Sequence, residues 1–180
     1  MSGWDAAFRF LMEHEGGWGT VKGDLGGRTR YGISSVAHPE IDLDKLTMSQ
    51  VADFYRVHYW DRIWGDDLPE PVARVVFDRG VMDGPGDAVN DLQLLLGLRV
   101  DGAVGPVTLQ WLSDYALGPH TVAHVLLQRW AKELAHRCQQ SPVKRNALPG
   151  WWIRTVDLAF EIGTVYVDVE LLEPKEAKTA

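Results

Sequence analysis

The residue with the strongest chemical signal is Glu15, near the amino terminus. Phe8, Leu11 and Met12 precede it at helical spacing, so the periodicity that builds a core also directs this carboxylate inward. The end of a helix and partial burial both disfavour the charged form of a carboxylate. A general acid working near neutral pH needs that property, whereas a Glu serving stability alone would lie exposed on a frayed helix end.

Asp24 and Thr29 follow in a glycine-rich segment, 18–35, which favours short β-strands and tight turns over a helix. A β-hairpin there would fold both side chains back toward Glu15. One protonated carboxyl, one carboxylate and a hydroxyl that holds a water form a set suited to glycoside hydrolysis. Taken alone, an Asp before Gly26-Gly27 is equally typical of a turn.

The elements that would position these groups are mostly helical. Thr47 to Gln50 form a capping box that opens a helix running to about residue 59 or 60. Prolines and glycines punctuate the rest of the chain. We expect further helices at about 4–15, 71–84, 86–96, 106–118, 119–137 and 151–163, and a strand-like alternation at 165–171. The fold class is mainly α (α+β), with a small β-hairpin element near the amino terminus.

Composition narrows the function classes. The 180 residues, 46% hydrophobic and 24% charged, suit one compact domain or one with a small second lobe. A net charge of −7 argues against nucleic acid as a partner. No apolar run is long enough to span a membrane, and no signal peptide is visible at the start. The single cysteine, Cys138, excludes an internal disulfide, and the His120/His124 spacing marks no complete metal site. We expect no metal and no cofactor.

The motifs Glu15–Trp18 and Asp24–Ile33 together resemble the opening of glycoside hydrolase family 108. Members of this family are peptidoglycan muramidases, found as phage endolysins and as bacterial secretion-linked lysozymes. The resemblance continues in order along most of the chain, at 59–61, 76–78, 84–86, 100–108 and 150–154.

This resemblance implies a lysozyme-like fold in which Glu15 is the general acid. The order Glu, Asp, Thr is also similar to phage-type lysozymes, which implies that Asp24 and Thr29 position the attacking water. The reaction would be hydrolysis of the β-1,4 bond between N-acetylmuramic acid and N-acetylglucosamine. The candidate substrate-binding residues are Trp18, Tyr31, Trp60 and Asp78, and we expect Trp18 and Trp60 to form walls of the saccharide groove.

The resemblance also suggests how the chain is divided. Residues 1–84 would form the lysozyme-like catalytic lobe, and 85–172 a helical, peptidoglycan-binding-like lobe packed on it. Within this second lobe, the segment 87–108 resembles a peptidoglycan-binding helix pair, but the same two helices could serve packing alone. Residues 173–180 have no core-like pattern and predict a flexible tail. Met82 stands where family members tend to carry Asn, which removes a polar group able to contact a sugar.

Several alternatives remain open at this stage. A lytic transglycosylase would need only Glu15, a chitinase-like enzyme would take another glycan, and a non-catalytic peptidoglycan-binding module would keep the fold without turnover. We expect a monomer whose partner is peptidoglycan. It would be made in the cytoplasm and reach the cell wall by holin-type or other assisted release.

Overall fold

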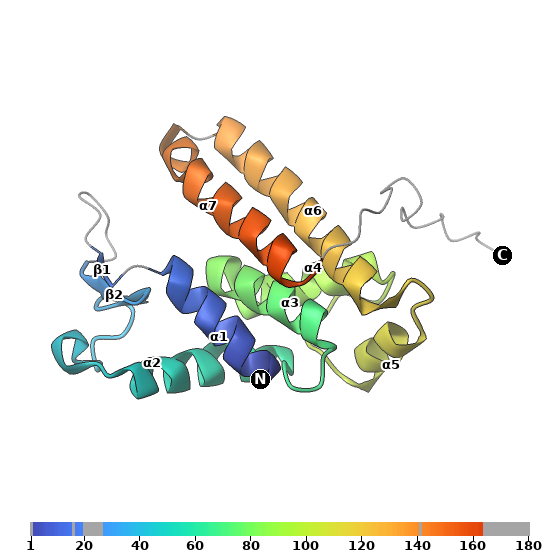
Figure 1. The fold of residues 1–180 in the computed structure, drawn as a ribbon, viewed down its shortest axis with the longest axis horizontal. Helices are drawn as coiled ribbons and strands as arrows, with labels where there is room; N and C mark the ends of the chain where they lie inside the picture. The colour runs from blue at the N-terminus through green and yellow to red at the C-terminus, as the bar shows by residue number, and fades with distance from the viewer. Residues whose placement is uncertain (1, 16, 20–26, 141, 164–180) are drawn as a thin grey trace.

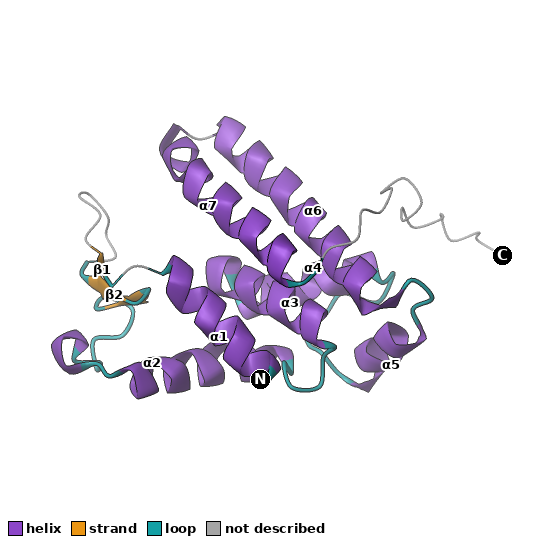
Figure 2. Ribbon diagram, viewed as in Figure 1, coloured by secondary structure: helices purple, strands orange, loops and turns teal. Residues whose placement is uncertain are grey.

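The computed structural model describes residues 2–15, 17–19, 27–140 and 142–163, with positions 19 and 142–148 described by their backbone alone. Helices dominate this part of the chain, and a small sheet lies at one end (Figures 1 and 2). No described helix is both long and apolar enough to cross a bilayer. The helices are α1 Gly3–His14, α2 Met48–Tyr55, α3 Glu70–Asp83, α4 Pro85–Leu95, α5 Pro106–Asp114, α6 Gly118–Gln140 and α7 Pro142–Glu161.

The sheet consists of three two-residue strands, β1 Trp18–Gly19, β2 Thr29–Arg30 and β3 Ile33–Ser34. They pair antiparallel in the order β1-β2-β3, with Trp18 opposite Arg30 and Arg30 opposite Ile33. The predicted β-hairpin in the glycine-rich segment is therefore confirmed, and the class is mainly α with a small β-element.

Local sequence signals set most helix ends. The predicted capping box of α2 is confirmed: Gln50 N–H donates to Thr47 Oγ1 at 3.3 Å, and Thr47 N–H donates to Gln50 Oε1 at 2.9 Å. The chain continues from α2 through a π-turn, Arg56–Trp60, and a 3₁₀ turn, Asp61–Ile63. The capping box therefore fixes where this helical run begins, and the run extends past the predicted end at 59–60.

The predicted start of the last helix was wrong. We expected it near Trp151. A proline lacks an N–H and its ring obstructs the preceding turn, which disfavours a helix that runs through Pro149. The helix instead begins at Pro142 and carries Pro149 inside it. The predicted strand at 165–171 and the tail at 173–180 lie outside the described residues.

Helix α3 is central to the packing. It contacts α1, α4 and α6, and α7 packs on α6. One hydrophobic cluster extends from α1 to α7, so the predicted lobe boundary at residue 84 falls at the α3–α4 turn, with continuous core on both sides. Because α3 is covered on all sides, its charged residues Arg74, Asp78 and Arg79 are buried and need partners.

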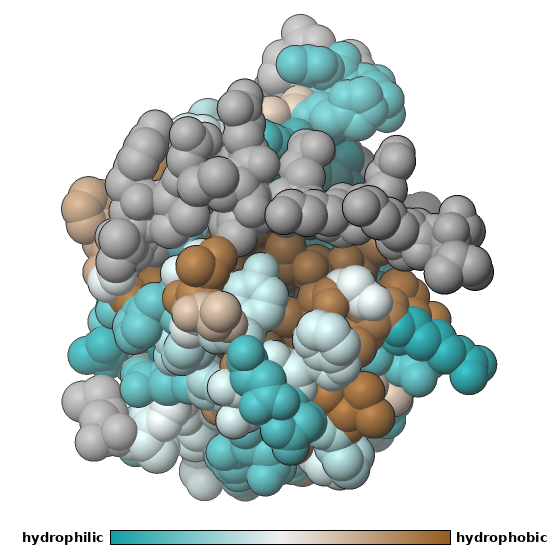
Figure 3. Space-filling view, turned by 90° about the vertical axis from the view of Figure 1, so that its right-hand side faces the viewer, coloured by the Kyte–Doolittle hydropathy of each residue, from teal (hydrophilic) through white to brown (hydrophobic). Residues whose placement is uncertain are grey.

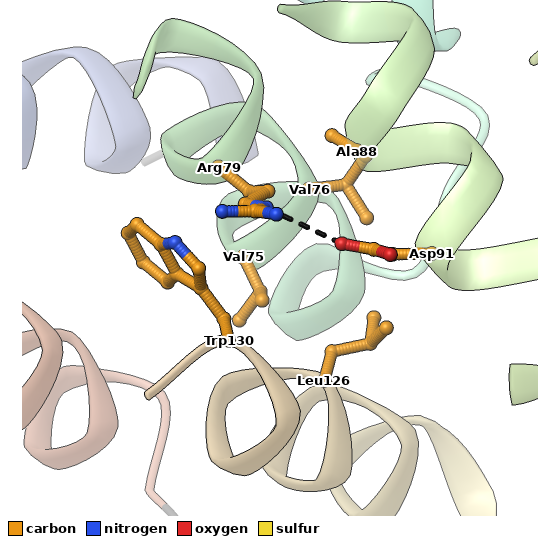
Figure 4. A pocket seen from close by; sticks show the side chains of 7 residues that line it. All are labelled: Val75, Val76, Arg79, Ala88, Asp91, Leu126 and Trp130. Atoms are coloured by element: carbon orange, nitrogen blue, oxygen red, sulfur yellow. Dashed lines mark hydrogen bonds and ion pairs between the residues drawn. The ribbon is translucent and has the colours of Figure 1, made fainter. Parts of the chain in front are cut away.

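A charge network joins α3 to α4 and α6, and Figure 4 shows its Arg79–Asp91 pair between α3 and α4. Arg79 lies 3.3 Å from Asp91 and 2.5 Å from Glu133 and also pairs with Asp83, which in turn accepts from Arg137 at 2.8 Å. Burial raises the pKa of the Asp91 carboxyl, and Arg79 opposes this effect. A cavity of about 10 Å³ lies beside the network, lined by Val75, Val76, Arg79, Ala88, Asp91, Leu126 and Trp130. These pairs hold the helix that carries Asp78.

The face that includes α5 shows hydrophobic side chains among polar ones (Figure 3). Large apolar residues of α5 and its neighbours, namely Leu94, Val107, Trp111 and Leu117, are exposed. This surface belongs to the segment predicted to resemble a peptidoglycan-binding helix pair.

Candidate active site

Glu15 is the first residue beyond α1, not part of its last turn as predicted. Its backbone is extended, with φ −85° and ψ 116°, and its N–H still donates to Leu11 O at 2.8 Å. The carboxylate therefore turns away from the helix axis. Its side chain is 22% exposed, which leaves it reachable from solvent.

A buried arginine from α7 holds this carboxylate. Arg154 Nη1 donates to Glu15 Oε1 at 2.9 Å, and Arg154 Nε donates to Asp78 Oδ1 at 2.8 Å. Arg154 is 5% exposed and Asp78 is 1% exposed, so the guanidinium lies between the core and the surface. Arg154 thus fixes one oxygen of Glu15, and Asp78 fixes Arg154.

Arg154 is the one cation between the two carboxylates of this triad. Burial raises the pKa of the Asp78 carboxyl, and the adjacent Arg154 opposes that rise. Burial lowers the pKa of Arg154, but Asp78 and Glu15 outweigh burial and raise it. The guanidinium therefore stays charged and remains a permanent donor to Glu15.

The turn between β2 and β3 packs against the other side of the carboxylate. Tyr31 and Gly32 have φ of 51° and 78°, as in the two-residue type I′ hairpin turn. Tyr55 Oη donates to Tyr31 O at 2.8 Å, and Tyr31 N–H donates to Gly17 O at 2.9 Å. A Cβ on Gly32 would lie 2.4 Å from the Tyr55 hydroxyl and 3.0 Å from Glu15 Oε2. Only glycine fits this position.

We expect Gly32→Ala to reduce activity at least tenfold, because the added methyl would displace the Tyr55 hydroxyl and the Glu15 carboxylate. Gly97→Ala is the matched control, since Gly97 has a similar φ of 67° but open space around the Cβ position. Both variants carry a left-handed backbone penalty of about 1 kcal/mol. Lysis rates and urea unfolding of the two would be compared. Equal activity in both would show that the turn does not position the acid.

Two tyrosines border the carboxylate. Burial raises the pKa of Tyr55 and of Tyr59, and the charge of Glu15 adds to both shifts. The phenols therefore stay protonated at neutral pH and can only act as neutral hydrogen-bonding groups. Their rings lie 5.4 Å apart and form an aromatic side of the site. Tyr59 belongs to the motif at 59–61 in the family resemblance, but no role was predicted for either tyrosine.

Several of the predicted site residues lie on the small sheet, whose first strand follows Glu15 closely in the chain. Trp18 is 51% exposed on β1, Tyr31 is half-buried at the β2–β3 turn, and Thr29 lies on β2 opposite Gly19. Asp24, the predicted partner of Thr29, lies outside the described residues.

The prediction that Trp60 forms a wall of the groove was wrong. Trp60 is 1% exposed and packs edge-on against Phe77 at 5.6 Å and Trp4 at 5.6 Å, while its Nε1–H donates to Asp66 at 3.0 Å. The π-turn after α2 directs the indole inward. The sequence alone does not distinguish a tryptophan that lines a groove from one that packs in the core.

The predicted contact between Asp78 and substrate is also corrected. The residue is sealed under Arg154, so it can act on the site only through that arginine. Arg154 itself had no predicted role, although it ends a motif of the family resemblance. The sequence feature that could have identified Arg154 is a cation on a helix face that otherwise points inward. Met82, which replaces the usual Asn, packs partly buried against the core. Within the described ranges, no three His, Cys, Asp or Glu side chains gather as metal ligands.

Comparison with known proteins found a matching family model and similar solved structures. Residues 8–84 match the family model for glycosyl hydrolase 108. Twelve solved chains are similar, among them SagA of Brucella abortus, which is 26% identical with a TM-score of 0.71 over 88% of this chain and 92% of SagA. No curated protein matches. Glu15, Tyr55 and Asp78 lie inside the family match, whereas Arg154 lies outside it.

Proposed function

We propose that this chain, a lysozyme-like glycoside hydrolase by its glycosyl hydrolase 108 domain, is a peptidoglycan muramidase. It would hydrolyse the β-1,4 bond between N-acetylmuramic acid and N-acetylglucosamine in the glycan strands of the cell wall. The observation that carries the proposal is the Glu15 carboxylate, held at one oxygen by Arg154 and confined at the other by Gly32.

In this mechanism Glu15 is the general acid. Its protonated form gives the proton to the glycosidic oxygen as the bond to the anomeric carbon breaks. Arg154 holds the carboxyl group in one orientation, so the acid is preorganised for proton transfer. After the transfer, the same guanidinium faces the newly formed carboxylate and stabilises its charge.

A second group must serve the water. Asp78 is unsuited to that role because it is buried under Arg154. The proposal therefore keeps Asp24 and Thr29 as the pair that orients water on the opposite face of the sugar. An inverting reaction of this kind requires the Glu15 and Asp24 carboxyl groups to stand about 6.5–9.5 Å apart.

The products test the reaction class. Purified peptidoglycan would be digested and the released fragments examined by mass spectrometry. A hydrolase leaves reducing N-acetylmuramic acid ends, and we expect these. Fragments ending in 1,6-anhydro-muramic acid would instead indicate a lytic transglycosylase using Glu15 alone. Binding to the wall without any release would indicate a non-catalytic module.

A further inference from the structure

Two arginines lie over the exposed tryptophan that follows Glu15. The guanidinium carbon of Arg28 is 4.5 Å from the centroid of the Trp18 ring, and that of Arg30 is 5.1 Å away. Arg30 also lies 5.3 Å from the Tyr31 ring. Such stacking orients a guanidinium while leaving its N–H edge able to donate. We name these three residues, Trp18, Arg28 and Arg30, the arginine platform.

The neighbouring 3₁₀ turn, Leu43–Lys45, anchors the arginine platform. Arg28 makes a bidentate pair with Asp44 at 2.8 and 3.3 Å, and Arg30 Nη1 donates to Leu43 O at 2.6 Å and Asp44 O at 3.1 Å. Among the described residues, no carboxylate forms an ion pair with Arg30. Asp42 also acts on Arg28 and pairs with Lys45, so three cations against the two carboxylates of Asp42 and Asp44 leave this surface with positive charge.

The arginine platform adjoins the carboxylate that the mechanism uses. Trp18 and Arg30 face each other across β1 and β2, and Arg30 immediately precedes the turn whose Gly32 touches Glu15. A glycan whose scissile bond lies at Glu15 would therefore place a flanking sugar near the arginines.

We propose that the arginine platform recognises the carboxylate carried by an N-acetylmuramic acid unit beside the cleaved bond. This inference rests on the proposed muramidase function. A guanidinium fork matches a carboxylate in shape and charge, and charge-assisted bonds are stronger than neutral ones. N-acetylglucosamine carries no carboxylate, so the platform selects peptidoglycan strands over chitin. The carboxylate belongs either to the lactyl group or to its attached peptide, and the ligands described below distinguish the two sources.

Binding to an inactive Glu15→Gln protein tests the platform by calorimetry. The ligands are a peptide-free muramic-acid-containing tetrasaccharide, the same strand bearing peptides, and neutral chitotetraose. We expect Arg30→Gln to weaken the first about fivefold, the scale of a partly exposed charge pair, and to leave chitotetraose within twofold. Weakening confined to the peptide-bearing strand would assign the carboxylate to the peptide.

Three further variants make the test specific. Arg30→Lys keeps the charge and should recover part of the affinity. Asp44→Asn frees Arg28 from its carboxylate partner and keeps the backbone carbonyls that hold Arg30, so it should strengthen binding of the muramic acid ligand. Arg62→Gln, an exposed arginine on the Asp61–Ile63 turn, is the control for a general loss of positive charge. Equal weakening of neutral and acidic ligands, or none, would overturn the proposal. An enzyme that discriminates the ligands yet releases no fragments from peptidoglycan would instead refute the muramidase function.

Discussion

Replacing Glu15 with Gln is expected to abolish wall lysis while leaving the protein folded. Gln keeps the shape of the side chain and can still accept the bond from Arg154, but it has no acidic proton to give. General acid catalysis contributes about 10²–10⁴-fold, so lysis should fall by at least 100-fold. The measurement is turbidity loss of purified peptidoglycan, with circular dichroism and urea unfolding to verify the fold.

Glu13→Gln is the matched control, since Glu13 lies two positions earlier on the exposed face of α1 and pairs only weakly with Arg9 at 3.9 Å. It should lyse at nearly the wild-type rate. Residual activity of Glu15→Gln within tenfold of wild type would remove Glu15 from the role of acid.

Replacing Arg154 with Met is expected to damage both stability and catalysis. The change leaves Asp78 as a buried charge without a cation, and breaking such a pair from one side destabilises a fold by about 3–5 kcal/mol. It also removes the donor that directs Glu15. Urea unfolding would measure the first effect and peptidoglycan lysis the second.

A double variant separates these two effects. Arg154→Met combined with Asp78→Leu removes both charges from the core, which should restore most of the lost stability because the uncompensated charge is gone. Activity should stay low, because nothing then holds Oε1 of Glu15. Recovery of lysis in the double variant would mean that Arg154 acts only on the fold. An Arg154→Met protein as stable as wild type would contradict the buried-pair interpretation.

The sequence predicted those features that depend on local chemistry. The capping box at Thr47, the prolines at the starts of α3 and α5, and the hairpin after Glu15 all follow from residues near one another in the chain. Each of these is set by backbone preferences that the tertiary structure left in place.

The features that sequence analysis missed depend on contacts between distant segments. Nothing near Arg154 in the sequence indicates that it pairs with Asp78 and Glu15, because the partners lie on α3 and at the end of α1. Trp60 was misplaced for the same reason: its burial depends on Trp4 and Phe77. Pro149 shows the opposite failure, where a strong local signal for a helix end is overridden.

The Glu15–Arg154 bond joins residues that are 139 positions apart in the chain. Amino-terminal segments emerge from the ribosome first, so α1 and the hairpin can form long before α7 exists. During that time Glu15 has no arginine to orient it. Closing so long a loop also carries an entropy penalty that only the complete core can offset. During synthesis the active site therefore stays incomplete until α7 packs against the rest of the fold. A chain that ends before α7 would lack the arginine that orients Glu15.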